Sequence, residues 1–242
     1  MRFLGFVGSV AGLLLLGGCA TLQVAEGPRP SDFLIHGVDV SKYQGEIDWP
    51  AARDSGVSFA WIKATEGGDY TDEYFDRNWQ AAKAAGIPRG AYHFAYWCRP
   101  GSEQVEWFEK HVPIEDDALP PVLDVEWTPT SRTCPRKVSR ETALAQMQVI
   151  LTEMERYYGK RPVIYTTVDF YRDVLDGGAF EDYPIWVRSV KHYPSVKYGD
   201  RRWHFWQYTA QGNVPGIKGY VDRNAFFGDG RQWQAFLDGP KS

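Results

Sequence analysis

The chain has 242 residues, of which 43% are apolar and 15% aromatic, and its formal net charge is −4 at pH 7. This length and apolar content fit one globular α/β domain with a full core and exclude a disordered chain. The small negative charge gives no electrostatic reason to expect nucleic acid as a partner. The 10 Trp, 14 Tyr and 13 Phe exceed the needs of a core this size, and such rings also hold sugars.

The first predicted element is an export signal. A positive charge at Arg2 precedes an apolar run over residues 3–16, which is short for a membrane span. The run leads into LGGC at residues 16–19, which resembles the bacterial lipobox, whose cysteine becomes the lipidated first residue. We expect residues 1–18 to be a lipoprotein signal peptide and acyl chains on Cys19 to hold the protein on a membrane. The alternative is an ordinary signal peptide with Cys19 incidental.

A tether and a folded domain follow this signal. Residues 19–32 contain Gly and Pro and are predicted as a short tether, and residues 33–242 are predicted as one domain. The protein is therefore expected to be exported and lipid-anchored to a bacterial membrane, on the periplasmic side of the outer membrane or at the cell surface.

From residue 35 onward, short β-rich runs alternate with helical patterns, which is typical of repeated βα units around a parallel sheet. The predicted strands are residues 35–40, 57–64, 90–96, 121–125, 162–166, 184–188, 203–208 and 219–222. The fold class is therefore α/β. We expect a TIM-like irregular barrel of five β/α units followed by three further β-strands.

Helices are predicted mainly in the first part of the chain. Ser139 can cap a helix that runs to Tyr158 and ends at Gly159, with apolar residues at helical spacing. The other predicted helices are residues 49–54, 72–85, 103–111 and 169–175. Beyond residue 180 we predict no helix, and residues 184–222 are expected to form short strands and loops.

Two acids end an apolar strand at Asp124 and Glu126. In a strand, residues i and i+2 face the same side about 7 Å apart, so these side chains project together and Val125 faces away. Two carboxyls on one face do not both ionise easily, so one keeps its proton near neutrality. An acid beside a carboxylate can cleave a glycosidic bond. For a D-x-E pattern alone, a structural ion pair is the alternative.

Two further acids are predicted at the same place. Asp39 lies at the end of the first predicted strand and Asp222 at the end of the last, and these strands are neighbours in a closed barrel. The C-terminal ends of barrel strands line the active site. Acids crowded at one mouth repel one another, which favours a functional site over a scaffold. For either residue alone, a turn or cap role is the alternative.

Local context separates the roles of the strand-end pair. Trp127 follows Glu126, and its ring is expected to exclude water from the carboxyl and raise its pKa. Asp124 lies one step deeper, near Asp39 and Asp222, and is expected to act as a fixed charge.

Export places the cysteines in an oxidising compartment, where disulfides persist. Cys98 and Cys134 each follow a strand end on the same expected rim of the barrel. We expect them to form a disulfide, and two free buried thiols are the alternative.

Six motifs in order carry a specific resemblance. They are DVSKYQG (39–45), KATEG (63–67), GAYHFA (90–95), DVE (124–126), WQY (206–208) and VDRN (221–224). Together they resemble glycoside hydrolase family 25, the Chalaropsis-type lysozymes, over roughly residues 35–227.

The resemblance implies a muramidase, a peptidoglycan hydrolase that cleaves the β-1,4 bond between N-acetylmuramic acid and N-acetylglucosamine, with residues 33–242 as its catalytic domain. It implies that Glu126 is the general acid. Asp124 would steady the substrate's acetamido group or the positive charge that develops at the sugar. Asp39 and Asp222 complete the catalytic cluster. The substrate-binding residues assigned near strand ends are Tyr92, Tyr165, Trp186 and Gln207.

Some residues depart from the family's pattern or have a second interpretation. Arg188 lies where similar enzymes carry a small residue, and residues 128–138 look inserted, so subsite preference is open. His93 is expected to be packed and hydrogen-bonded, with a catalytic base as the alternative. Lys63 and Glu66 are expected to be structural, with partnership of the acidic cluster as the alternative.

Two other functions fit the same residues. The acids could hold Mg²⁺ or Ca²⁺ in a metal-dependent phosphoester hydrolase, although none of the 5 His residues forms an H-x-H or H-E-x-x-H pair. A non-catalytic lipid-anchored cell-wall binding protein would keep the groove, but it gains nothing from a protonated acid. We expect no metal and no cofactor. The expected partners of a monomer are peptidoglycan glycan strands and the membrane.

Overall fold

The computed structural model describes residues 27–135 and 137–239. The predicted signal peptide and Cys19 lie outside this part of the chain. Within it, no helix combines the length and the apolar character needed to cross a membrane.

All strands belong to one sheet, which closes because β1 pairs with β2 as well as with β9. Every strand except β3 forms the barrel, and β3 is an antiparallel addition to β2 that the sequence analysis did not predict. The strands are β1 (His36–Val40), β2 (Phe59–Glu66), β3 (Tyr70–Thr71), β4 (Arg89–Phe94), β5 (Val122–Val125), β6 (Val163–Thr166), β7 (Ile185–Arg188), β8 (Phe205–Gly212) and β9 (Val221–Phe226).

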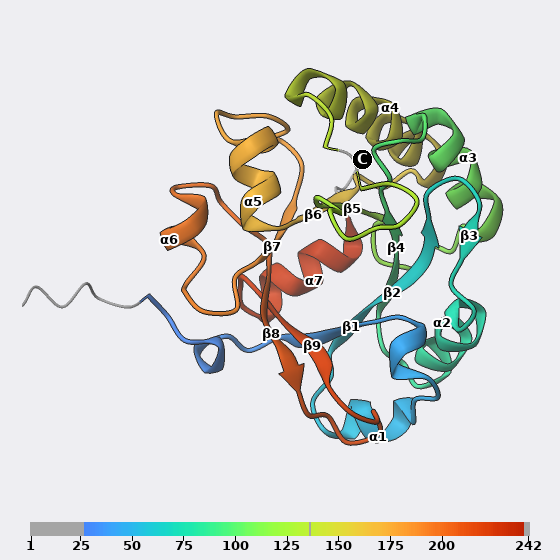
Figure 1. Ribbon diagram of the computed structural model, residues 1–242. Helices are drawn as coiled ribbons and strands as arrows, with labels where there is room; N and C mark the ends of the chain where they lie inside the picture. The colour runs from blue at the N-terminus through green and yellow to red at the C-terminus, as the bar shows by residue number, and fades with distance from the viewer. Residues whose placement is uncertain (1–26, 136, 240–242) are drawn as a thin grey trace, which may run out of the picture.

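The barrel strands run parallel from β1 to β8, and β9 is antiparallel to both of its neighbours, β8 and β1. Helices α1 to α5 follow the first barrel strands and cover the outside of the barrel (Figure 1). The prediction of an irregular α/β barrel, with β/α units followed by further strands, is therefore confirmed.

The α-helices are α1 (Trp49–Asp54), α2 (Phe75–Ala84), α3 (Gly101–His111), α4 (Arg140–Tyr158), α5 (Val168–Phe170), α6 (Ser195–Tyr198) and α7 (Gly230–Asp238). A π-helical turn, η3 (Tyr171–Leu175), continues α5, and 3₁₀ turns form η1 (Pro30–Asp32) and η2 (Lys42–Gln44). Helix α4 has the predicted boundaries, because the Ser139 hydroxyl accepts a hydrogen bond from the Thr142 amide at 3.1 Å and Gly159 adopts a φ of 64°.

The prediction that no helix follows residue 180 is wrong, because α6 and α7 lie there. The Asp229 carboxylate caps α7 by accepting a hydrogen bond from the Gln232 amide at 2.9 Å. Trp233 and Phe236 of α7 pack against Phe59 and Phe205, the first residues of β2 and β8. Helix α7 therefore covers the end of the barrel where the parallel strands begin, opposite the strand ends that carry the acids (Figure 1).

The barrel interior is filled by aromatic side chains from alternate strand positions. Trp61 of β2 stacks on Trp186 of β7 with ring centroids 5.8 Å apart, and both rings are buried. Gly90 of β4 makes room for this layer, since a Cβ atom there would come within 2.1 Å of the Trp61 ring. The same alternation points the next inward position of each strand into the open end, where the side chains are polar.

The N-terminal end of the described chain packs onto the barrel. Residues 27–30 lie against the connection that follows β7, around Tyr193 and Val196. The contact is close at Gly27, where a Cβ atom would come within 2.3 Å of the Tyr193 ring. This part of the predicted tether is therefore docked on the domain.

Candidate active site

A cleft of about 710 Å³ lies at the C-terminal end of the parallel strands. Every residue predicted to be catalytic or substrate-binding lines it: Asp39, Tyr92, Asp124, Glu126, Tyr165, Trp186, Gln207 and Asp222. These residues come from β1, β4, β5, β6, β7, β8 and β9, so closure of the barrel brings them together.

The central pair comes from the end of β5. Asp124 lies inside the strand with 6% exposure, Glu126 is the first residue beyond it and is half-buried, and Val125 packs outward into the core. Burial raises the pKa of Glu126 to about 7, with the Arg188 cation opposing this rise. Burial and the charge of Glu126 raise the pKa of Asp124 well above its usual range. The pair therefore retains a proton near neutrality.

The burial of Asp124 bears on the two roles expected for it, which were to steady the substrate's acetamido group or to act as a fixed charge. Burial disfavours ionisation of this carboxyl in the free protein. Its Oδ1 atom is buried and accepts no hydrogen bond from any described residue. The raised pKa of Asp124 favours contact with the acetamido group over the role of a fixed charge.

The second acid pair joins the first and last strands. Asp39 of β1 and Asp222 of β9 are directly opposite in the antiparallel ladder. The Asp39 carboxylate accepts hydrogen bonds from the side-chain amides of Asn224, at 2.8 Å, and Gln207, at 3.0 and 3.2 Å. Burial and the charge of Asp222 raise the pKa of Asp39 to about 8 even though these hydrogen bonds oppose the rise. Burial also raises the pKa of Asp222.

The residues predicted to bind substrate lie at two depths. The Tyr165 hydroxyl donates a hydrogen bond to the side-chain carbonyl of Gln207 at 3.0 Å, and the side-chain amide of Gln207 in turn donates to the Asp39 carboxylate. Trp186 is 2% exposed and donates its indole N–H to Asn224 at 2.8 Å. Gln207 and Trp186 thus form the floor under the acids, while Tyr92 is half-buried in the wall.

Asn224 is a site residue that the sequence analysis did not assign. Its amide donates to Asp39 and its carbonyl accepts from Trp186, so it links the floor to the acid pair. The VDRN motif contained it, but a buried asparagine in a strand has no local pattern that marks it as a partner of a carboxylate.

Two cationic side chains of the cleft, Lys63 and Arg188, differ in their ion-pair partners. Lys63 of β2 forms an ion pair with Glu66 at 2.5 Å, and Glu66 also accepts a hydrogen bond from the Tyr96 hydroxyl. Burial alone would raise the pKa of Glu66, but the charge and hydrogen bond of Lys63 lower it overall. Arg188 projects into the cleft from the end of β7, and within the described chain its guanidinium has no ion pair within 4.0 Å. Its charge acts on Glu126, Asp39 and Asp222 from a greater distance.

His93 lies outside this cluster. It is fully buried and its ring forms hydrogen bonds with Thr65 at 2.7 Å and Gln104 at 3.2 Å. Burial lowers the pKa of His93 to about 4, so the ring is neutral near pH 7. Its side chain packs behind β4 and does not line the cleft.

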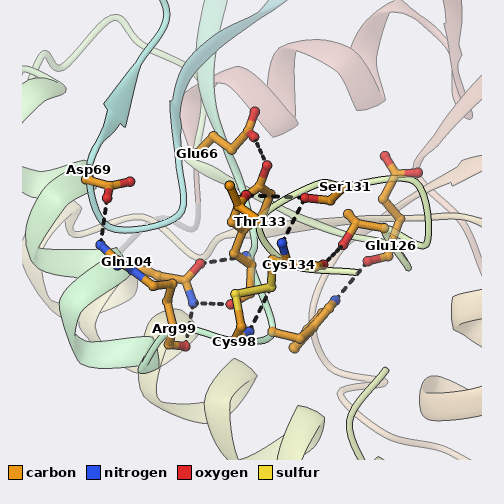
Figure 2. The surroundings of a disulfide bond; sticks show 12 residues. Glu66, Asp69, Cys98, Arg99, Gln104, Glu126, Ser131, Thr133 and Cys134 are labelled. Carbon is orange, nitrogen blue, oxygen red and sulfur yellow. Dashed lines mark hydrogen bonds and ion pairs between the residues drawn. A yellow bond between two sulfur atoms is a disulfide. The ribbon is translucent and has the colours of Figure 1, made fainter. Parts of the chain in front are cut away.

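A disulfide between Cys98 and Cys134 joins the segment after β4 to the loop after β5, as Figure 2 shows. Cys134 is buried, and the Cys98 amide donates a hydrogen bond to the Cys134 Sγ atom at 3.0 Å. Next to Cys98, the Trp97 indole donates to the Glu126 carbonyl at 2.8 Å. The crosslink therefore holds the segment that supports the backbone of Glu126.

Within residues 27–135 and 137–239, no group of three or more His, Cys, Asp or Glu side chains is arranged to hold a metal ion.

The family described as Glycosyl hydrolases family 25 matches residues 38–217. The chain belongs to glycosyl hydrolase family 25. The family 25 match includes Asp39, Asp124 and Glu126, and it ends before Asp222.

Relatives of this family 25 chain cover most of its length. It is 39% identical over 218 residues to the uncharacterized protein YegX of Escherichia coli (strain K12), and the matched region covers 88% of this chain and 76% of YegX. It is 37% identical over 211 residues to Lysozyme M1 of Streptomyces globisporus, covering 80% of this chain and 68% of the relative. A solved family 25 glycosyl hydrolase from Bacillus anthracis superposes with a TM-score of 0.79 at 36% identity, covering 86% of this chain and 96% of that structure.

Proposed function

We propose that this protein is a lysozyme of the muramidase type, which cleaves the β-1,4 bond between N-acetylmuramic acid and N-acetylglucosamine in peptidoglycan. The observation that carries the proposal is the pair of carboxyls of Asp124 and Glu126 in the cleft, where burial raises the pKa of both. Membership of family 25 and the likeness to Lysozyme M1 support the same activity.

Glu126 is the general acid of the proposed reaction. With a pKa of about 7, its carboxyl is protonated in much of the protein at neutral pH and can give the proton to the glycosidic oxygen as the bond breaks. Asp124, which lines the cleft one step deeper than Glu126, steadies the acetamido group of the sugar or the positive charge that develops at the sugar. Asp39 and Asp222 supply negative charge on the opposite side of the mouth once either of them ionises.

The test is digestion of purified peptidoglycan by residues 33–242. We expect solubilisation and new reducing ends on muramic acid, and we expect Glu126→Gln to abolish most of both. Products that end in an anhydro sugar, or cleaved peptides, contradict the proposal. Loss of activity in EDTA points to a metal-dependent phosphoester hydrolase, and wall binding without turnover points to a binding protein.

We also propose that Cys19 is lipidated and anchors the enzyme to a bacterial membrane. The support is the LGGC sequence at residues 16–19 after a short apolar leader. Cys19→Ser should move the protein from the detergent phase into the soluble fraction. Unchanged membrane partitioning of this variant contradicts acylation at Cys19.

A further inference from the structure

Two exposed tyrosines lie on adjacent segments, and one of them, Tyr43, lines the acid cleft. Tyr43 of η2 is 82% exposed and Tyr220, just before β9, is 63% exposed. Their segments are adjacent, because η2 follows β1, β9 pairs with β1, and the Gln44 amide donates to the Tyr220 carbonyl at 3.2 Å. An exposed aromatic ring alone needs no ligand, and it is the place of Tyr43 on the wall of a cleft that makes it a candidate contact for one.

Tyr43 is continuous with the acid cleft. The wall of the cleft includes Asp39, Ser41 and Tyr43, so Tyr43 borders the same cavity as the acids. A polymeric ligand that passes over Asp39 and leaves the cleft on this side would next meet Tyr43.

The backbone under Tyr43 is fixed before any ligand binds. The Ser41 amide donates to the Gln44 side chain at 3.0 Å, and the Lys42 amide donates to the buried carboxylate of Asp72 at 2.9 Å. Gly45 ends the turn with a φ of 59°, which favours glycine. Because the backbone is already fixed, a ligand that contacts this ring has to order only the tyrosine side chain.

The chemistry of this edge fits a sugar better than an apolar partner. Each tyrosine offers a flat apolar face and a hydroxyl at its edge, which matches a pyranose ring with its C–H face and hydroxyl rim. Lys42 lies between Tyr43 and Tyr70, with its ammonium 5.9 and 5.2 Å from the two ring centroids. A protein partner that docks through apolar contact would require a wide apolar surface without such a charge.

We propose that Tyr43, with Tyr220 on the adjacent segment, forms a distal glycan subsite at the outer end of the acid cleft, where it stacks on a further sugar ring of the same strand. This inference rests on the proposed function, because the occupant is the glycan strand that the acids cleave. The subsite makes the protein prefer long strands over short fragments.

The test compares Tyr43→Ala with Tyr157→Ala in the whole folded domain. Tyr157 of α4 is a matched control, because it is an exposed tyrosine, at 37%, on an outer helix away from the cleft. For Tyr43→Ala, the ratio of kcat/KM on long glycan strands to kcat/KM on a short muropeptide fragment should fall about 3- to 10-fold. Tyr43→Phe, which keeps the ring, should retain most of the ratio, and Tyr157→Ala should leave it unchanged.

Binding gives a second readout that does not need turnover. In a Glu126→Gln background, Tyr43→Ala should weaken retention on purified glycan strands by a similar factor, whereas Tyr157→Ala should not. An unchanged length ratio together with unchanged retention overturns the subsite. Equal loss on long and short substrates also overturns it, since it means that Tyr43 supports the cleft itself. If the wild type does not cleave peptidoglycan, the proposed function fails, and the retention assay still decides the subsite.

Discussion

Removal of the Cys98–Cys134 disulfide should lower the stability of the domain substantially. The sequence separation is 36, so the crosslink closes a loop of about 37 residues, for which the chain-entropy model gives about 4 kcal/mol at 25 °C. In a domain of this size each kcal/mol corresponds to about 2 to 4 °C in Tm, so Cys98→Ser/Cys134→Ser should melt about 8 to 15 °C lower. Serine at residue 134 keeps an acceptor for the Cys98 amide, so most of this loss reports the crosslink.

The assay is calorimetry of the wild type and the double variant, each with and without a thiol reductant. Reductant should lower the Tm of the wild type toward that of the variant and leave the variant unchanged. A Tm difference below about 2 °C, with both thiols of the reduced wild type shown to be free, would refute the reasoning. It would mean that the loop is equally ordered by its packing around Trp97 and Trp127, whose rings lie 5.9 Å apart.

Three further outcomes follow from the acids of the cleft. Glu126→Gln should lose about 10² to 10⁴ in turnover on peptidoglycan while retention on insoluble wall persists, and near-native turnover would exclude Glu126 as the acid. Because the acid must be protonated, kcat/KM should fall as pH rises through about 7. Arg188→Gln removes a cation that lowers the pKa of Glu126, so this variant should move the falling limb of the pH profile to higher pH. A falling limb that stays in place contradicts the assignment of Glu126 as the acid. Burial and Asp222 raise the pKa of folded Asp39 from 3.8 to about 8, so the folded state binds more protons than the unfolded state between these values and loses stability as pH rises through them. Asp39→Asn should therefore gain stability relative to the wild type between pH 5 and pH 8 in denaturant titrations, and a difference that is constant with pH would contradict this.

Much of the barrel could be predicted from local patterns. Strand alternation and the caps of α4 are encoded within a few residues, and the predicted strands begin within about two residues of the observed ones. The acids Asp124 and Glu126 were also visible locally, because their spacing places both on one face of β5.

The missed features depend on contacts between distant segments or on short patterns. Helix α7 carries Trp233, Phe236 and Leu237 at helical spacing behind an Asp229 cap, so its signal was present but only about two turns long. Strand β3 has two residues and exists only through its pairing with β2. The role of Asn224 arises from the β1–β9 pairing, which joins residues 185 positions apart.

The raised pKa of Asp124 could not be predicted from the sequence either. Its protonation depends on how deeply the strand end is buried and on the nearby charge of Glu126, which spacing alone does not specify. The same holds for Arg188, whose effect on the acids depends on the closure of the barrel.

If Cys19 is lipidated as proposed, the docking of Gly27 beside Tyr193 limits how far the domain can lie from the membrane. Only eight positions separate Cys19 from Gly27 (27 − 19), and a fully extended chain of that length spans at most ~28 Å. A longer linker without this contact would let the domain reach glycan strands farther from the membrane. Because Gly27 is held on the domain, an enzyme acylated at Cys19 would reach only the glycan strands nearest the bilayer. The length of residues 19–27 would then limit the depth of wall that the enzyme cleaves.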